Sequence, residues 1–272
     1  MLWCNVLDLH FAADQPDEVL REVAERCYRP LVGLLGDAPR GGVTMSVDGV
    51  LLERLRDDGM GDIIEGLGRL VEEGRVELMG SAAQNAILTA LDEDGMKRAI
   101  EEHARVSRRV FGALFKPAGF FPPELSYSPA VGRVVDALGY EWLLVDETAA
   151  DELKPTPLHQ CLYAVEGADS LTVFFRDRSL STGILYRGFE GADDFAGAVG
   201  EPACRTGYLV TATAAEVYGY HHAGYEGFLA AVLGDERVES STLSGLLTRY
   251  GQDRTPVRLR QSSWSPWATL QY

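Results

Sequence analysis

Apolar residues along the chain fall into two alternating patterns, short continuous runs and longer segments with helical spacing. The short runs are rich in Val, Leu and aromatic residues, which is typical of strands that are buried on both faces. Their positions predict strands at 2–11, 43–47, 76–80, 119–121, 142–147, 171–177 and 208–214.

Between these runs, apolar residues recur at the spacing of a helix face. Such segments begin near Pro16, span 60–73 and 92–114, and run from Ser128 to Gly139. The stretch 148–170 shows neither pattern, and we expect it to be an irregular insertion that acts as a lid or substrate loop.

The alternation of strands and helices predicts an α/β fold, a parallel sheet or barrel wrapped by helices. The chain has 272 residues, a size that a barrel fills as one domain, so we expect a single domain over 1–272. In such folds the carboxyl ends of the strands carry the site.

Charge narrows the range of partners. The chain has 41 acidic and 25 basic residues and a formal net charge of −16, which argues against nucleic acid or an anionic membrane surface. No apolar run approaches the length of about 20 residues that spans a membrane. The first residues lack the basic segment of a signal peptide, so we expect a cytoplasmic location. The oligomeric state is left open.

The cysteines do not indicate a metal site. None of the four forms a CxxC pair, so we expect buried thiols rather than structural zinc, and no cofactor. They are Cys4, Cys27, Cys161 and Cys204.

Glu124 is the first candidate for chemistry. It follows Phe120-Phe121-Pro122-Pro123, so a strand and two prolines hold it on stiff backbone. A nucleophile needs such placement, because small displacements cost rate. The alternative is a solvated loop carboxylate.

Other polar residues follow the remaining strands. Asp8 and His10 share one strand face, and with His221 or His222 they form a possible metal site or simply line a barrel mouth. Arg176 and Asp177 suit either an ion pair or contacts to sugar hydroxyls. The further candidates are Asp146, Glu216, Tyr220 and Trp264, the last of which either stacks on sugar rings or packs in the core.

Taken in order, several segments resemble blocks of glycoside hydrolase family 57, the family of α-amylases, 4-α-glucanotransferases and branching enzymes. The similar segments are SVDGVLLERL (46–55), GRVELMGSAAQNAIL (74–88), GFFPPELSYSPAVGRVVDALGYEWLLVDE (119–147), VFFRDRSLS (173–181), AEVYGYHHAGYEGFL (215–229) and SSWS (262–265).

The resemblance implies an incomplete (β/α)7 barrel and retaining chemistry on α-glucosidic bonds of an oligosaccharide or α-glucan. It implies that Glu124 is the nucleophile. We expect substrate contacts from His10, Asp146, Arg176, Asp177, Tyr220, His221 and Trp264. Retaining enzymes need a second carboxyl group about 5 Å away to protonate the leaving oxygen.

The chain departs from the family pattern at that second group. The position of the acid/base aspartate, two residues before Glu216, is Ala214. A histidine of the first block is missing in the stretch from His10 to Pro16, and a glutamate-proline pair is replaced by Asn85-Ala86.

Three explanations of Ala214 remain open at this point. The protein is a sugar-binding pseudoenzyme, or Glu216, Asp146 or a histidine has become the proton donor, or Ala214 is an engineered change. A metal-dependent hydrolase or deacetylase that uses Asp8, His10 and His221 or His222 is a weaker alternative.

Overall fold

The computed structural model describes residues 2–39, 41–153, 161–199, 207–251 and 253–265, and Cys204 lies outside them. The strands are β1 Leu2–Leu9, β2 Val43–Val47, β3 Val76–Leu78, β4 Gly119–Phe120, β5 Trp142–Asp146, β6 Leu162–Val165, β7 Ala168–Arg176, β8 Tyr208–Ala214, β9 Glu239–Ser240 and β10 Arg254–Val257. The α-helices are α1 Asp17–Val23, α2 Arg29–Asp37, α3 Gly49–Asp57, α4 Gly61–Glu72, α5 Glu93–Phe111, α6 Pro129–Ala137, α7 Arg178–Leu185, α8 Ala192–Val199, α9 Glu226–Gly234 and α10 Leu243–Tyr250.

Shorter helical turns join several of these elements. A π-helical turn, η1, covers Ala24–Tyr28 between α1 and α2. The 3₁₀ turns are η2 Ala83–Asn85, η3 Leu88–Ala90, η4 Gly112–Leu114, η5 Pro123–Leu125, η6 Glu147–Leu153 and η8 Ala215–Val217.

Parallel strands form an incomplete barrel with helices outside it. Hydrogen-bonded neighbours run β3-β2-β1-β8 in one sheet, and β7-β5-β4 in the other. A bridge between Gly80 and Phe120 joins β3 to β4. No strand ladder joins β7 to β8 in the described part of the chain. There the Asp177 amide donates to the Val210 carbonyl at 2.8 Å, and the Arg176 side chain donates to the Ala212 carbonyl at 2.9 Å.

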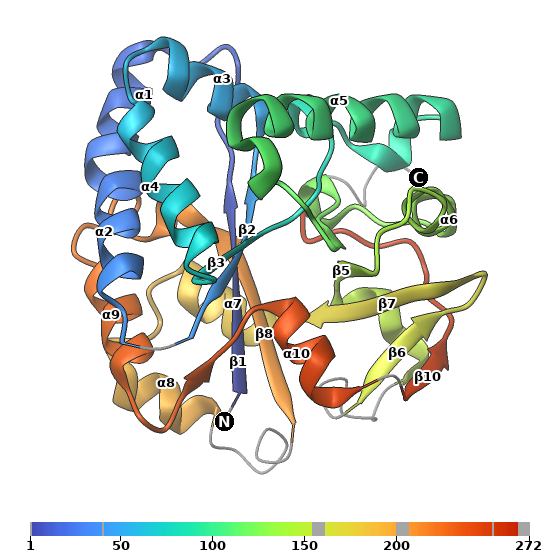
Figure 1. The fold of residues 1–272 in the computed structure, drawn as a ribbon. Helices are drawn as coiled ribbons and strands as arrows, with labels where there is room; N and C mark the ends of the chain where they lie inside the picture. Colours follow the sequence, from blue (N-terminus) through green and yellow to red (C-terminus); the bar gives the residue numbers. More distant parts are fainter. Residues whose placement is uncertain (1, 40, 154–160, 200–206, 252, 266–272) are drawn as a thin grey trace.

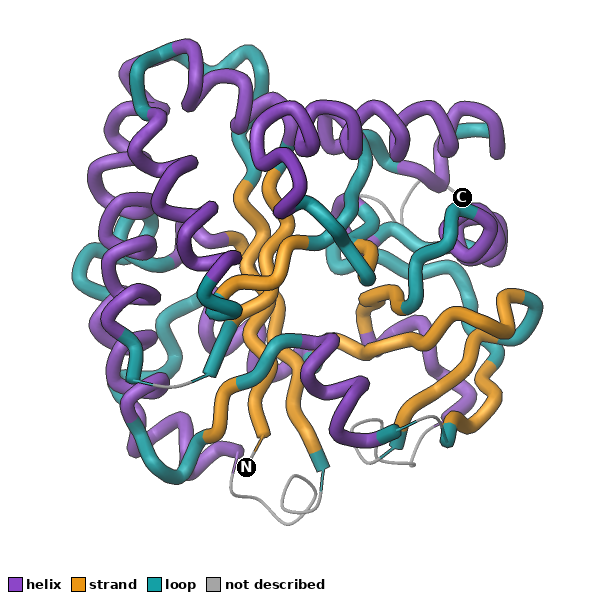
Figure 2. Tube along the Cα trace, in the orientation of Figure 1, coloured by secondary structure: helices purple, strands orange, loops and turns teal. Residues whose placement is uncertain are grey.

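The strands of the barrel separate an inner apolar core from an outer apolar core under the helices. Along β1, Leu2, Cys4 and Val6 face the interior, where they pack with inward residues of β5, β7 and β8. The alternate residues of β1 pack under the outer helices. Helices α1, α2, α4 and α9 cover the β1–β2–β8 side, while α5 runs across one end of the barrel (Figure 1, Figure 2).

Glu77 ties a helix to the barrel. Its carboxylate accepts hydrogen bonds from the Ser244 amide at 3.1 Å and from the Thr44 hydroxyl at 3.2 Å. Burial raises the pKa of Glu77, and these hydrogen bonds oppose that rise. Helix α10 thereby lies beside the amino ends of the strands (Figure 1).

The predicted strands all occur, each within three residues of its expected bounds. One expectation was wrong. The segment 148–170 is not simply irregular, because it contains most of η6, then β6 and the start of β7, although 154–160 lie outside the described residues. The barrel strands pair in parallel, as expected, and β6, which the sequence did not predict, runs antiparallel to β7 beside them.

No helix among the described residues is both long and apolar enough to cross a membrane.

Candidate functional site

Polar side chains gather where the barrel strands end. Asp8, Asp146 and Arg176 continue the inward-facing series of β1, β5 and β7, and Ala214 continues that of β8. Glu124 follows β4 within η5. The structure therefore brings most of the predicted site residues to the carboxyl end of one barrel.

Glu124 sits on strained backbone. Its φ of 58° and ψ of 19° place a residue with a side chain in the left-handed region, and Leu125 after it has φ 47°. Such conformations persist only where the surroundings enforce them, and they cluster at functional sites. Pro122 and Pro123 restrict the approach to this turn. The expected stiff placement of Glu124 thus has a clear backbone basis.

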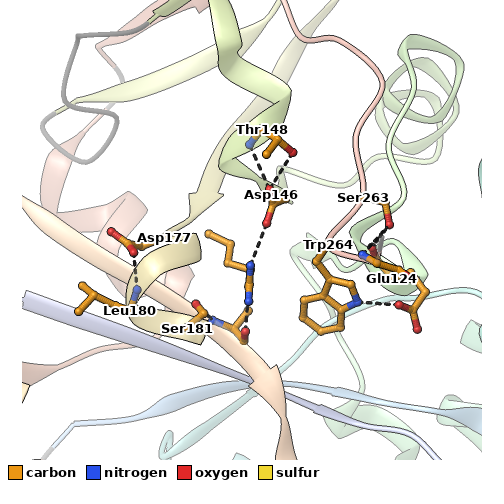
Figure 3. A network of polar contacts seen from close by, with 11 residues as sticks. Glu124, Asp146, Thr148, Asp177, Leu180, Ser181, Ser263 and Trp264 are labelled. Carbon is orange, nitrogen blue, oxygen red and sulfur yellow. Dashed lines mark hydrogen bonds and ion pairs between the residues drawn. The ribbon is translucent and has the colours of Figure 1, made fainter. Parts of the chain in front are cut away.

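Trp264 holds the Glu124 side chain. The indole nitrogen donates to Oε2 of Glu124 at 2.7 Å, and the Ser263 hydroxyl donates to the Glu124 carbonyl at 2.8 Å (Figure 3). Backbone hydrogen bonds between Tyr127 and Ser262 fix this late segment beside η5. Trp264 also packs on Phe121, with 5.5 Å between ring centroids. Trp264 therefore both packs on Phe121 and orients the carboxylate of Glu124.

Arg176 forms a buried ion pair with Asp146, and not with Asp177 beside it in the sequence. Nη1 of Arg176 lies 2.9 Å from Oδ2 of Asp146, and Thr148 donates to the other oxygen of Asp146 (Figure 3). Burial lowers the pKa of Arg176, and Asp146 opposes that shift. The guanidinium lies 5.4 Å from the ring of Trp264, so this pair adjoins the support of Glu124.

Asp8 and Ala214 are neighbours across two paired strands. Their Cα atoms are register partners of the β1–β8 ladder, and Ser46 is the partner of Asp8 on β2. Asp8 is only 9% exposed. Burial raises the pKa of Asp8 to about 7; a hydrogen bond with Ser46 opposes the rise, and the charges of Glu216 and Glu124 add to it.

Glu216 lies deeper and is held by hydrogen bonds. It accepts from the Tyr28 hydroxyl and from the backbone amide of His10. Burial raises the pKa of Glu216 to about 7, against the effect of these bonds. Two buried carboxyl groups that ionise near neutral pH thus lie at the end of β1 and β8.

A local break in the first helix places Tyr28. Pro30 has no amide hydrogen to donate to the Arg26 carbonyl, and Arg29 bonds instead to the carbonyl of Ala24, five residues back. Gly219, at φ 106°, packs there; a Cβ on it would lie 2.1 Å from the Arg26 carbonyl oxygen. The turn after β8 and the π-helical turn therefore fit together, with Tyr28 against Glu216.

His10 pairs with a residue that the sequence did not single out. Its Nδ1 lies 3.6 Å from Oδ2 of Asp48, which is 6% exposed. Burial by itself lowers the pKa of His10, but the nearby carboxylate of Asp48, with the charges of Asp8 and Glu216, raises it overall. Asp48 follows β2 directly, and that strand-end position was the available signal.

Four candidate residues have other contacts. Asp177 caps α7, since Oδ1 accepts from the Leu180 amide at 2.8 Å (Figure 3). Tyr220 lies against the Arg26 guanidinium at 5.5 Å and beside His221, which is exposed. His222 lies 2.8 Å from the Leu185 carbonyl.

These contacts bear on the metal hypothesis. Among the described residues, no group of three or more His, Cys, Asp and Glu side chains is arranged to hold a metal ion. Asp8, His10, His221 and His222, the residues of the weaker metal alternative, do not form such a group among the described residues.

A cleft of about 380 Å³ opens beside Ala214 and Trp264. Arg176 and Arg178 supply its charge, and Tyr186, which is 74% exposed, lies on its wall. Sequence reasoning missed Tyr186, because a single tyrosine after a helix carries no signal. A cleft with guanidinium groups and aromatic rings suits a polyhydroxylated ligand.

Comparison with known proteins gives a family model that matches most of the chain. A family model described as glycosyl hydrolase family 57 matches residues 6–241. The α-amylase of Pyrococcus abyssi is 25% identical over 171 residues, which are 62% of this chain and 26% of that protein. The chain therefore spans about a quarter of the length of that curated relative.

Solved structures show the same fold. The 4-α-glucanotransferase from Thermococcus litoralis superposes with a TM-score of 0.82 at 20% identity, over 97% of this chain and 42% of that one. The branching enzyme from Pyrococcus horikoshii gives 0.83 at 18% identity, over 98% and 73% of the two chains. At these identities the likeness establishes the barrel architecture.

Proposed function

This chain belongs to glycosyl hydrolase family 57, and on that premise we propose that it hydrolyses or transfers α-glucosyl units of an oligosaccharide or α-glucan, with Glu124 as the nucleophile. We also treat residues 1–272 as one domain. The observation that carries the proposal is the strained, indole-held carboxylate of Glu124 beside the cleft wall formed by Trp264.

The chemistry follows from this placement. Retaining cleavage begins with attack of a carboxylate on the anomeric carbon, and it requires that carboxylate to be positioned before the substrate arrives. The Trp264 indole fixes one oxygen of Glu124 and leaves the other for attack. We assign Trp264 and Arg176 to substrate binding, since both line the cleft, and Asp146 to holding Arg176.

The remaining predicted contacts are assigned by position. His10 lies at the same strand ends as Asp8, so we assign it to the sugar site. We give supporting roles to Asp177, Tyr220 and His221. Asp177 caps α7, and Tyr220 contacts both Arg26 and His221.

The test is turnover of an α-glucoside with an activated aryl leaving group, alongside maltooligosaccharides. Glu124→Gln removes the attacking charge but keeps the shape of the side chain, so turnover of both should fall by about 10⁴-fold. Glu166→Gln, an exposed glutamate between β6 and β7, is the matched control and should behave like the wild type. Equal rates for Glu124→Gln and the control would contradict the proposal.

A sugar-binding pseudoenzyme is the second candidate, because Ala214 supplies no proton to a leaving group. General acid catalysis is worth about 10²–10⁴-fold, so its complete absence would leave slow chemistry. The distinguishing outcome is a thermal shift with maltooligosaccharides and no turnover of either substrate. That result would favour binding over catalysis.

A further inference from the structure

The reaction needs a proton donor near Glu124, and the residue beside Ala214 has the chemistry for it. Asp8 is the register partner of Ala214, and both side chains face the barrel interior at the end of their strands. A carboxyl group on the adjacent strand can therefore reach the region that a longer side chain at 214 would occupy. The cleft beside Ala214 leaves that region open to a ligand.

Charged groups surround Asp8 on several sides. The charges of Glu216 after β8 and Glu124 after β4 raise the pKa of Asp8, and the charge of His10 lowers it. Tyr28 of η1 lies close enough for Asp8 to raise the pKa of its phenol, and Ser46 of β2 hydrogen-bonds the Asp8 carboxyl group. Asp8 therefore sits within electrostatic reach of the proposed nucleophile.

We propose that Asp8 is the acid/base catalytic residue of this chain, acting from β1 in place of the missing carboxyl group at 214. The assignment rests on the proposed function. Two observations carry it: the register of Asp8 with Ala214, and its inward direction at the carboxyl end of β1.

The step balances without another reactant. An oxygen of Glu124 forms a bond to the anomeric carbon, the bond from that carbon to the leaving oxygen breaks, and the carboxyl proton of Asp8 passes to that oxygen. In the second half, the Asp8 carboxylate takes a proton from water or a sugar hydroxyl, whose oxygen displaces Glu124.

Other acidic groups at the strand ends are engaged elsewhere. Glu216 accepts from Tyr28 and from the His10 amide, and Asp146 is held by Arg176 and Thr148. His10 faces Asp48. Burial keeps the pKa of Asp8 near 7, so a carboxyl proton is present to donate at slightly acid pH.

The experiment compares leaving groups in Asp8→Asn. We expect kcat/KM for maltooligosaccharides to fall by about 10²–10⁴-fold, because their leaving oxygen needs protonation. For the activated aryl α-glucoside, kcat/KM should stay within about threefold of the wild type, because that leaving group departs without a proton. For maltooligosaccharides, the loss of kcat/KM above about pH 7 that Asp8 deprotonation causes in the wild type should be absent from the Asp8→Asn profile.

The response of Asp8→Asn to azide distinguishes a catalytic role of Asp8 from a structural one. An azide ion attacks the glucosyl-Glu124 intermediate without needing a base, so it should restore kcat of Asp8→Asn and yield the α-glucosyl azide. Glu77→Gln is the matched control, a buried carboxyl group of the same barrel away from the strand ends. Its substrate ratio and pH profile should match the wild type.

The outcomes separate the two proposals. If Glu124→Gln abolishes turnover while Asp8→Asn keeps the wild-type substrate ratio, pH profile and azide response, the assignment of Asp8 fails and the proposed function stands. If the wild type turns over neither substrate, both fail together. A thermal melt of each variant shows whether a loss of rate reflects a loss of folding.

Discussion

At the residue scale, Asp8 and Glu216 couple stability to pH. Burial raises the pKa of both to about 7, above their values in an unfolded chain. Between about pH 4 and pH 7 the folded chain holds protons that the unfolded chain has lost, so the free energy of unfolding falls as pH rises. This direction is opposite to that of a salt-bridged carboxylate.

The prediction concerns Asp8→Asn, which cannot ionise. Its Tm should exceed that of the wild type at pH 8, and the difference should shrink toward pH 4, where Asp8 is neutral. The gain corresponds to about 2–4 kcal/mol at most, shared with Glu216. Differential scanning calorimetry from pH 4 to pH 8 measures it, with Glu166→Gln as the control. Parallel Tm curves for Asp8→Asn and wild type would contradict the burial argument.

Trp264 carries a second prediction at this scale. Trp264→Phe keeps an aromatic ring on Phe121 but removes the N–H that donates to Glu124. A carboxylate free to rotate is misplaced for attack, and misplacement by about 1 Å costs roughly 10²-fold in rate. We expect kcat for the aryl glucoside to fall by about 10- to 100-fold.

The control for Trp264 is a tryptophan with a different partner. The Trp142 indole donates to the Ser244 hydroxyl at 3.0 Å, within the barrel, so Trp142→Phe should lower stability and leave kcat nearly unchanged. Similar losses of kcat in both variants would mean that the indole bond to Glu124 is not what matters.

Sequence reasoning picked out candidate residues that follow apolar strand segments and missed residues whose role depends on packing. Glu124 was predictable because prolines and an aromatic strand precede it. The role of Tyr28 was not, since it depends on a π-helical turn beside Pro30 and on contact with a turn almost 190 residues later. The apolar spacing from Pro16 onward predicts one continuous helix, because a single inserted residue barely disturbs the periodicity.

At the element scale, the short strand β4 determines where Glu124 lies. Strand β4 has two residues and sits just before η5, which holds Glu124. A Cβ built on Gly119 would lie 2.0 Å from the ring of Trp142 on the neighbouring strand. Only a glycine permits this approach of β4 to β5.

Gly119→Ala should therefore strain the pairing of β4. Overpacking typically costs about 1–3 kcal/mol, and the displaced strand should also lower kcat by moving Glu124. Urea unfolding and aryl glucoside turnover measure the two effects. Gly61→Ala is the control, because a Cβ there meets nothing within 4 Å. The change from glycine to alanine affects the unfolded chain in the same way in both variants. Equal stability of the two variants would contradict the close contact.

Strands at the edge of the sheet could not be predicted from the hydrophobic pattern. The parallel strands were predictable because burial on both faces makes them continuous apolar runs. Strands β6 and β10 pair with each other at a sheet edge, where β10 consists of Arg254–Val257 and has exposed positions. Such a mixed segment has neither apolar continuity nor strict alternation, so its strand depends on tertiary pairing.

At the scale of the whole molecule, the question is how far the barrel has diverged from a glucan-cleaving site. The left-handed turn and the indole of Trp264 both hold the Glu124 side chain in place. The departure at Ala214 removes one carboxyl group, and its register partner on the next strand carries another. On the proposal that Asp8 is the acid/base residue, one function has moved to the neighbouring strand while the rest of the site is kept.

Restoring the carboxyl group tests that view. In the wild type, Ala214→Asp would place a second acid next to Asp8, and neighbouring carboxyl groups hinder each other's ionisation, so activity should change little or fall. In the Asp8→Asn background the new aspartate has no competitor, and the cleft beside 214 gives it room.

The double variant Asp8→Asn, Ala214→Asp should therefore recover maltooligosaccharide turnover by at least about 10-fold over Asp8→Asn alone, because an acid returns to the reacting oxygen. The coupling between the two changes is the measured quantity, since independent sites would give additive effects. Additive losses would mean that the barrel mouth has changed beyond one residue. Recovery would mean that strands β1 and β8 present interchangeable positions for the same proton.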